Sequence, residues 1–133
     1  MLADLIRAAK RVYLIGNGGS FANAAHIAND LLACGVKAHT LDAATLTASA
    51  NDYGYETVFE RWIRVVGESG DLLIALSGSG KSENILRACD AAQELGMEVW
   101  PEFGARKGLD MQQAEEAQLK IGHDYLRCSR PKT

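Results

Sequence analysis

The sequence has 133 residues, of which 47% are hydrophobic, which is enough for one compact domain and too little for two. A formal net charge of −3 argues against nucleic acid or an anionic membrane as the main partner, because both favour a basic face. The three cysteines are odd in number and form no CxxC pair, so we expect a reduced, cytoplasmic setting. No apolar run reaches the roughly 20 residues that cross a bilayer, and no membrane span is expected.

The first predicted strand is a short apolar, β-branched run at residues 11–15 (RVYLI). It leads into the glycine-rich stretch GNGGS at residues 16–20. The stretch SFANAAHIANDLLACG then shows helical spacing of its apolar residues. The order strand, tight loop, helix is therefore predicted for this part of the chain.

The same order recurs further along. Residues 37–41 are predicted to form a strand, and residues 55–66 a helix with one apolar stripe. The run DLLIAL at residues 71–76 is typical of a buried strand, and it continues into SGSGKS at residues 77–82. A helix is expected to follow as far as Leu95, where the next residue is a glycine that can cap it.

A last strand is predicted at residues 97–100, and a final helix at residues 110–127. Asp110 and Gln113 have the spacing of a capping box at the start of that helix. Strands that alternate with helices across short loops indicate an α/β fold, in which a parallel sheet is covered by helices on both faces. We expect the chain to form one such domain over residues 1–133.

The first glycine-rich loop is a candidate ligand site, because the carboxyl ends of parallel strands collect the N-termini of the following helices. Its glycines let the backbone approach a ligand closely, and Ser20 offers a hydroxyl at the start of the helix. The loop is not GxGxxG, and Asp42 alone stands near the usual ribose-binding place. A dinucleotide site is therefore the weaker interpretation, and no nucleotide cofactor is expected.

The second loop presents Ser77, Ser79 and Ser82 beside flexible glycines at another helix N-terminus. Hydroxyl and backbone donors that converge in this way suit a phosphate. The spacing of an NTP-binding loop is absent, so Lys81 is given no nucleotide role. Either loop alone is equally well explained as a tight turn rich in small residues, but the two together favour a binding site.

Four segments resemble the sugar isomerase (SIS) domain family, and specifically the phosphoheptose isomerases. The segments, in chain order, are LIGNGGSFANAAHIANDLL, ANDYGYETVF, LLIALSGSGKSENIL and AEEAQLKIGH. The resemblance implies a three-layer flavodoxin-like sandwich with a parallel sheet of about four strands, a shortened SIS fold. It also implies a tetramer that isomerises sedoheptulose 7-phosphate to an aldoheptose 7-phosphate, with zinc in some members.

The resemblance also assigns roles to individual residues. Asp30 and His123 are implied as the catalytic pair, with Asp30 abstracting a proton and His123 acting at the oxygens. A zinc site of His26, Asp30, Glu115 and His123 is the competing interpretation of the same atoms. The residues implied to bind the sugar phosphate are Asn17, Gly18, Ser20, Asp52, Ser77, Gly78, Ser79, Ser82 and Glu115.

The chain departs from the family in four respects. Asp30 replaces a glutamate and Glu115 replaces a glutamine, while both remain able to bind a metal. The long helical segment that precedes the first strand in the family, and a fifth strand before the last helix, are both expected to be missing here.

Helical spacing bears on the acidic and histidine residues independently of the family. His26 and Asp30 are four residues apart and therefore share one helix face. This spacing suits a catalytic base, a metal site, or a solvated pair in which the histidine bonds to the carboxylate. Spacing alone would align Glu116 with His123 slightly better than Glu115, although a solvated position is the simpler expectation for Glu116. His39 has no partner in the sequence and is expected to be structural.

Two classes of function remain open at this stage. The first is an aldose–ketose isomerase that works through an enediol and forms a homodimer or homotetramer. The second is a non-catalytic SIS module that binds a sugar phosphate or a protein as a regulator. The retained acid and base residues favour the enzyme.

Overall fold

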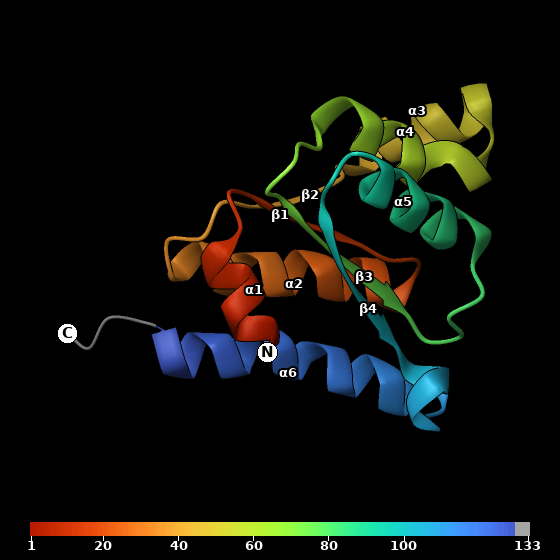
Figure 1. Cartoon of the computed structure of the whole chain (residues 1–133). Coiled ribbons are helices and arrows are strands. Elements are labelled where there is room, and N and C mark those ends of the chain that lie inside the picture. The colour runs from red at the N-terminus through yellow and green to blue at the C-terminus, as the bar shows by residue number, and fades with distance from the viewer. Residues whose placement is uncertain (130–133) are drawn as a thin grey trace.

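The computed structural model describes residues 1–129, and these form a parallel four-stranded sheet between two layers of helices (Figure 1). The strands lie in the order β2-β1-β3-β4, and all three neighbouring pairs are parallel. Their bounds are Val12–Ile15 for β1, Ala38–Thr40 for β2, Leu72–Ser77 for β3 and Glu98–Phe103 for β4. The prediction of a sheet of about four parallel strands is confirmed.

Six α-helices and two short 3-10 helices connect and flank the strands of the described chain. They are α1 (Leu2–Ala8), α2 (Gly19–Ala33), α3 (Ala43–Tyr53), η1 (Tyr55–Thr57), α4 (Val58–Val66), α5 (Glu83–Glu94), η2 (Gly104–Lys107) and α6 (Met111–Ser129). Figure 1 shows α1, α2 and α6 on one face of the sheet and α3, α4 and α5 on the other. This is the three-layer arrangement that the sequence predicts.

Alternating residues of the central strands supply the two halves of the core. Val12 and Leu14 of β1 pack under α2 and α6, while Tyr13 and Ile15 pack under α4 and α5. Strands buried on both faces in this way carry continuous apolar runs, which explains why VYLI and LLIAL are predictable as strands. The α4 stripe that contains Phe59 belongs to the core.

Most of the predicted elements form within one or two residues of their expected bounds. The capping box is present, because Asp110 N–H donates to Gln113 Oε1 (3.0 Å) and Gln113 N–H donates to Asp110 Oδ1 (2.8 Å). The predicted helix at residues 55–66 divides into η1 and α4. A short helix, α1, precedes the first strand.

Two elements differ from the prediction. Helix α3 was not predicted from the sequence; none of its residues is fully buried, and its half-buried Leu46 and Ala50 pack against the core. Strand β4 extends three residues beyond the predicted end at Trp100 and includes Pro101.

Pro101 fits in β4 because of the direction in which its missing N–H would point. Glu98 donates its N–H to the carbonyl of Asp71, which precedes β3, so the even-numbered residues of β4 bond to β3. Odd-numbered residues, including Pro101, face the open edge of the sheet, where no ladder hydrogen bond is lost.

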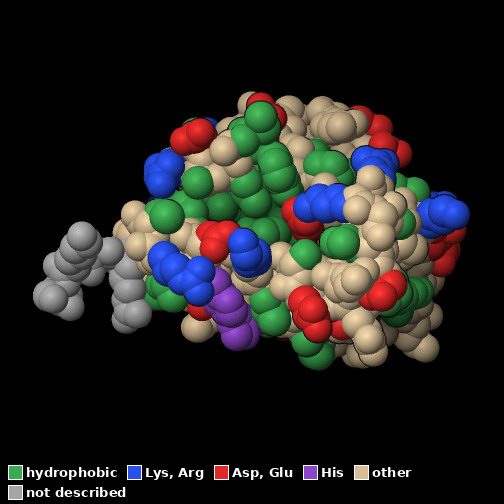
Figure 2. Space-filling model, turned by 90° about the horizontal axis from the view of Figure 1, so that it is seen from below, with side chains coloured by type: hydrophobic (Ala, Val, Ile, Leu, Met, Phe, Trp, Pro, Cys, Tyr) green, Lys and Arg blue, Asp and Glu red, His purple; other side chains and the backbone are tan. Residues whose placement is uncertain are grey.

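A groove of about 470 Å³ lies between α1, α6 and β4. Its floor contains Ile6, Trp100 and Ile121. Figure 2 views this side of the molecule and shows a band of hydrophobic side chains there, with histidine side chains at the surface. Among the described residues, no helix combines the length and hydropathy that a membrane crossing requires.

Candidate active site

The two ligand loops predicted from the sequence lie side by side, because β1 and β3 are neighbours in the sheet. Ile15 at the end of β1 is in register with Ala75 of β3. Helix α2 leaves the first loop on one face, and α5 leaves the second loop on the other. A crevice between such diverging helices is where open parallel sheets bind ligands.

The first loop requires glycine at specific positions. Gly18 has φ of 56°, in the left-handed region, and a Cβ on Gly16 would lie 2.7 Å from Ser20. The Ser20 N–H donates to the Asn17 carbonyl (2.9 Å), which closes the turn and begins α2. The loop therefore places the Ser20 hydroxyl at the helix N-terminus, as predicted.

The second loop uses its serine oxygens as acceptors and keeps their hydrogens available. Ser77 Oγ accepts from the Gly80 N–H (3.0 Å), and Ser79 Oγ accepts from the Lys81 N–H (3.1 Å). Each hydroxyl can still donate its own hydrogen to a ligand. Ser82 is the N-cap of α5, yet its side chain makes no capping bond.

A cavity of about 50 Å³ joins the two loops, which is room for several waters or one phosphate group. Most of the sequence-predicted substrate residues line it. The lining residues are Asn17, Ser20, Leu76, Ser77, Gly78, Ser79, Ser82 and Met111. A Cβ on Gly78 would lie 2.3 Å from the Met111 sulfur, so Gly78 is needed where α6 begins to cover the loop.

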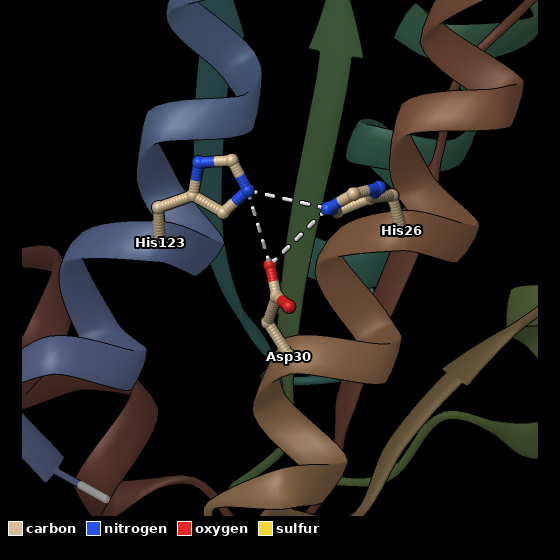
Figure 3. A group of neighbouring side chains, drawn as sticks. All are labelled: His26, Asp30 and His123. Carbon is tan, nitrogen blue, oxygen red and sulfur yellow. Dashed lines mark hydrogen bonds and ion pairs between the residues drawn. The ribbon is translucent and has the colours of Figure 1, made fainter.

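Three of the predicted metal ligands meet between α2 and α6 (Figure 3). His26 Nε2 lies 3.2 Å from His123 Nε2, and these nitrogens lie 3.7 and 3.8 Å from Asp30 Oδ2. The candidate ligand atoms of all three residues fall within 4.8 Å of one another. Residues almost 100 positions apart in the sequence therefore form one group.

The Asp30 carboxylate is poorly satisfied by the protein alone. Asp30 is only 8% exposed, and its Oδ2 is buried without a hydrogen-bond partner. Gly122 of α6 makes room for it, because a Cβ there would lie 2.6 Å from Oδ2. A buried carboxylate oxygen faced by two imidazole nitrogens suits a divalent cation such as zinc, and the donor set fits one.

Glu115 and Asp52 lie outside this group of three. The half-buried Glu115 places its carboxylate against Gly19 in the first turn of α2, since a Cβ on Gly19 would lie 2.4 Å from Glu115 Oε2. Asp52 is exposed near the end of α3 and accepts from the side chain of Asn51 (3.2 Å). Glu116 is exposed, as its predicted solvated position requires.

Gln118 was not among the residues predicted from the sequence, and it is 0% exposed between α2 and α6. Its Nε2 donates to Ser20 Oγ (3.0 Å), and its Oε1 accepts from Asn23 Nδ2 (2.9 Å). A glutamine four residues from both Ala114 and Gly122, in the buried stripe of α6, was the signal that could have identified it. Gln118 orients the Ser20 hydroxyl and leaves its hydrogen free for the cavity.

Asn17 also contacts residues that the sequence did not indicate. Asn17 and Asn84 exchange two side-chain hydrogen bonds of 2.9 Å each, and the Tyr55 hydroxyl donates to Asn17 Oδ1 (2.5 Å). These contacts join the first loop to η1 and to the first turn of α5. The separations in sequence are 67 and 38 residues, beyond the reach of any local pattern.

Other chemically interesting side chains have structural roles. Burial raises the pKa of the Cys89 thiol to about 11, so this thiol is protonated at neutral pH and is no nucleophile. His39 stacks on Tyr13, with ring centroids 5.5 Å apart. Asp42 is the N-cap of α3, where the backbone and hydroxyl of Thr45 hold the pKa of its carboxyl below the ordinary value.

Comparison with known proteins identifies the same family as the motifs do. The SIS domain family matches residues 1–100. A phosphoheptose isomerase of Akkermansia muciniphila is 39% identical over 129 residues, which cover 91% of this chain and 68% of that protein. A phosphoheptose isomerase of Campylobacter concisus is 42% identical over 108 residues, or 74% of this chain and 57% of that protein.

Solved structures agree with the sequence comparison. The structure of a phosphoheptose isomerase from Neisseria gonorrhoeae matches 96% of this chain and 79% of its own, with a TM-score of 0.84 and 27% identity. The chain thus spans about two thirds of the length of one curated relative and less of another.

Proposed function

We infer the function from the premise that this chain belongs to the SIS domain family, as a phosphoheptose isomerase-like member. It is a sugar-phosphate isomerase that interconverts an aldose and a ketose, and sedoheptulose 7-phosphate is the proposed substrate. The observation that carries this proposal is the position of two sites along α2. A phosphate-sized cavity lies at its N-terminus, and the His26–Asp30–His123 group lies further along the same helix.

The spacing of these two sites suits one extended substrate. Ser20 and His26 are six residues apart, and a helix rises about 1.5 Å per residue, so the axial separation is about 9 Å. That is the scale of an extended sugar-phosphate chain. A phosphate held by the serine loop would direct the carbonyl end of the sugar towards the two histidines, and anchoring of this kind orients the reacting atoms.

The proton transfer is assigned to Asp30 and His123. An enediol mechanism needs a base at one carbon and an acid at the neighbouring oxygen. The buried Asp30 Oδ2 makes no hydrogen bond within the protein, which leaves a lone pair available to abstract a proton. His123 is about half exposed at the same point and can protonate the oxygen.

We propose zinc as the cofactor of this group, held by His26, Asp30 and His123, whereas Glu115 lies apart from the group, at the start of α2. When bound, the ion would polarise the substrate carbonyl. Ligation by Asp30 competes with its use as a base, and a zinc titration followed by activity measurement separates the two roles.

The domain is proposed to extend beyond the family match to the end of α6, because His123 of that helix completes the His26–Asp30–His123 group.

A homodimer or homotetramer is also proposed. It is supported by the wide exposure of His26 and His123, with 52% and 42% of their side-chain surfaces open, and by the apolar groove beside α6. A cytoplasmic location is proposed from the odd cysteine count.

The decisive test follows exchange of substrate protons in heavy water by NMR. We expect deuterium to enter sedoheptulose 7-phosphate in the presence of the protein, and the rate to fall by about a hundredfold or more in Asp30→Asn and His123→Ala. Ser79→Ala should weaken phosphate binding and leave the proton-transfer group intact. Binding without exchange across a panel of phosphorylated ketoses and aldoses would replace the enzyme with the non-catalytic sugar-phosphate module.

A further inference from the structure

We propose that Tyr55 is a positioning residue of the phosphate site, and that it acts through the side chain of Asn17. This inference rests on the proposed function, because it concerns how the first loop is held ready for the phosphate of the substrate. The juxtaposition that carries it is a chain of three side chains from η1, the first loop and α5.

Asn17 has little freedom left to bind a sugar with its own side chain. Its Oδ1 accepts from both Tyr55 and Asn84, which uses both lone pairs of an amide oxygen. Its Nδ2 donates to the Asn84 side chain, which is buried with only 4% exposed. One hydrogen of Nδ2 remains for a ligand, but the three bonds to Tyr55 and Asn84 hold the Asn17 side chain in place and join the first loop to η1 and α5.

The backbone of Asn17 transmits this restraint to the cavity. The Asn17 carbonyl accepts from the N–H of Ser20, and both residues line the phosphate-sized space. Without its side-chain hydrogen bonds, Asn17 as a whole would be less restrained, and its carbonyl and the Ser20 N–H bonded to it could move together. The Tyr55 hydroxyl thus sets the position of a ligand donor that it does not touch.

Tyr55 has no comparable role in holding the fold. Tyr55 is 47% exposed, and η1 contains no buried residue. The preceding helix, α3, also has no buried residue. Removing the hydroxyl of Tyr55 leaves its ring in place and disturbs no core contact, so an effect on ligand affinity would not reflect unfolding.

The test compares Tyr55→Phe with Tyr53→Phe, a matched control whose ring stacks under Arg61 at the surface. The readouts are the affinity for inorganic phosphate by calorimetry, the melting temperature, and KM and kcat with sedoheptulose 7-phosphate. We expect Tyr55→Phe to weaken phosphate binding and raise KM by roughly two- to tenfold, the range for one lost hydrogen bond. The melting temperature, kcat and all values for Tyr53→Phe should stay near those of the wild type.

A double-mutant cycle shows whether Tyr55 acts through Asn17. In an Asn17→Ala background, Tyr55→Phe should have no further effect on phosphate affinity. If Asn17→Ala binds phosphate too weakly to measure, Asn84→Ala provides the background, and the effect of Tyr55→Phe should shrink there.

Three outcomes overturn the inference, and they are distinguishable. Equal phosphate affinity in wild type and Tyr55→Phe shows that the hydroxyl does not position the site. An undiminished effect in the Asn17→Ala background, or in the Asn84→Ala background where that is used, shows that Tyr55 contacts the ligand directly. Failure of the wild type itself to bind phosphate removes the proposed function together with this inference.

Discussion

The substitution Gly122→Ala tests whether the position of Asp30 matters for the reaction. A Cβ on Gly122 would lie 2.6 Å from Asp30 Oδ2, whereas real Cβ atoms essentially never approach closer than 3.0 Å and ordinary contact begins at 3.4 Å. To bring the distance from 2.6 Å up to 3.0 or 3.4 Å, the carboxylate, or the helix that carries it, must move away by about 0.4 to 0.8 Å.

The effect on stability should be small because two contributions oppose each other. Replacing glycine by alanine inside a helix stabilises it by about 1 kcal/mol. Overpacking costs about 1–3 kcal/mol, so the net loss is about 0–2 kcal/mol and the melting temperature falls by at most about 8 °C.

The effect on catalysis should be larger. Catalytic groups tolerate displacements of about 0.5 Å from their productive positions, and a misplacement of about 1 Å can lower the rate a hundredfold. We therefore expect kcat/KM of Gly122→Ala to fall by about tenfold or more, with weaker zinc binding and with unchanged affinity for inorganic phosphate at the other end of α2.

The assay measures isomerisation, zinc affinity and phosphate affinity on the same preparation. Glu116→Ala, on the exposed face of α6, is the control for introducing an alanine into this helix. Values of kcat/KM and zinc affinity within twofold of the wild type would refute the view that the buried position of Asp30 supports the reaction.

Three further predictions concern other parts of the site. His123→Ala should lower zinc affinity by on the order of a hundredfold, measured by competition with a chelating dye; unchanged affinity would place the ion elsewhere. Gln118→Leu should weaken phosphate binding a few-fold, by about one hydrogen bond, because Ser20 loses the donor that orients it, and calorimetry with inorganic phosphate would detect this. Since Thr45 holds the pKa of Asp42 below its ordinary value, the cap contributes stability above the unfolded pKa of about 3.9, and that contribution is lost as the pH falls through the lower folded value. Asp42→Asn should keep the cap and remove this acid dependence, as thermal melts from pH 6 downwards would show.

The sheet and its two ligand loops were predictable because each rests on a local pattern. Buried parallel strands carry unbroken apolar runs, as in Leu72–Ser77, and glycines mark where the chain must turn sharply. Helix α3 gives a weaker periodic signal, because only partly buried residues such as Leu46 and Ala50 contact the core, and its Asp42 cap supports its first turn.

The site was predictable only in part, for a related physical reason. Helical spacing placed His26 and Asp30 on one face, but nothing local connects them to His123, and the family resemblance supplied that link. The partners of Asn17 and Ser20 come from 38 to 98 residues away, so only the fold reveals them.

The open edge of β4 has a consequence for the behaviour of this protein at high concentration. An exposed strand edge is a template on which another chain can add a strand, and repeated addition leads to aggregation. Pro101 interrupts the row of edge donors near its centre, since a proline has no N–H to offer an incoming strand. A sheet that stops at four strands can thus remain open on this side without becoming the seed of a fibril.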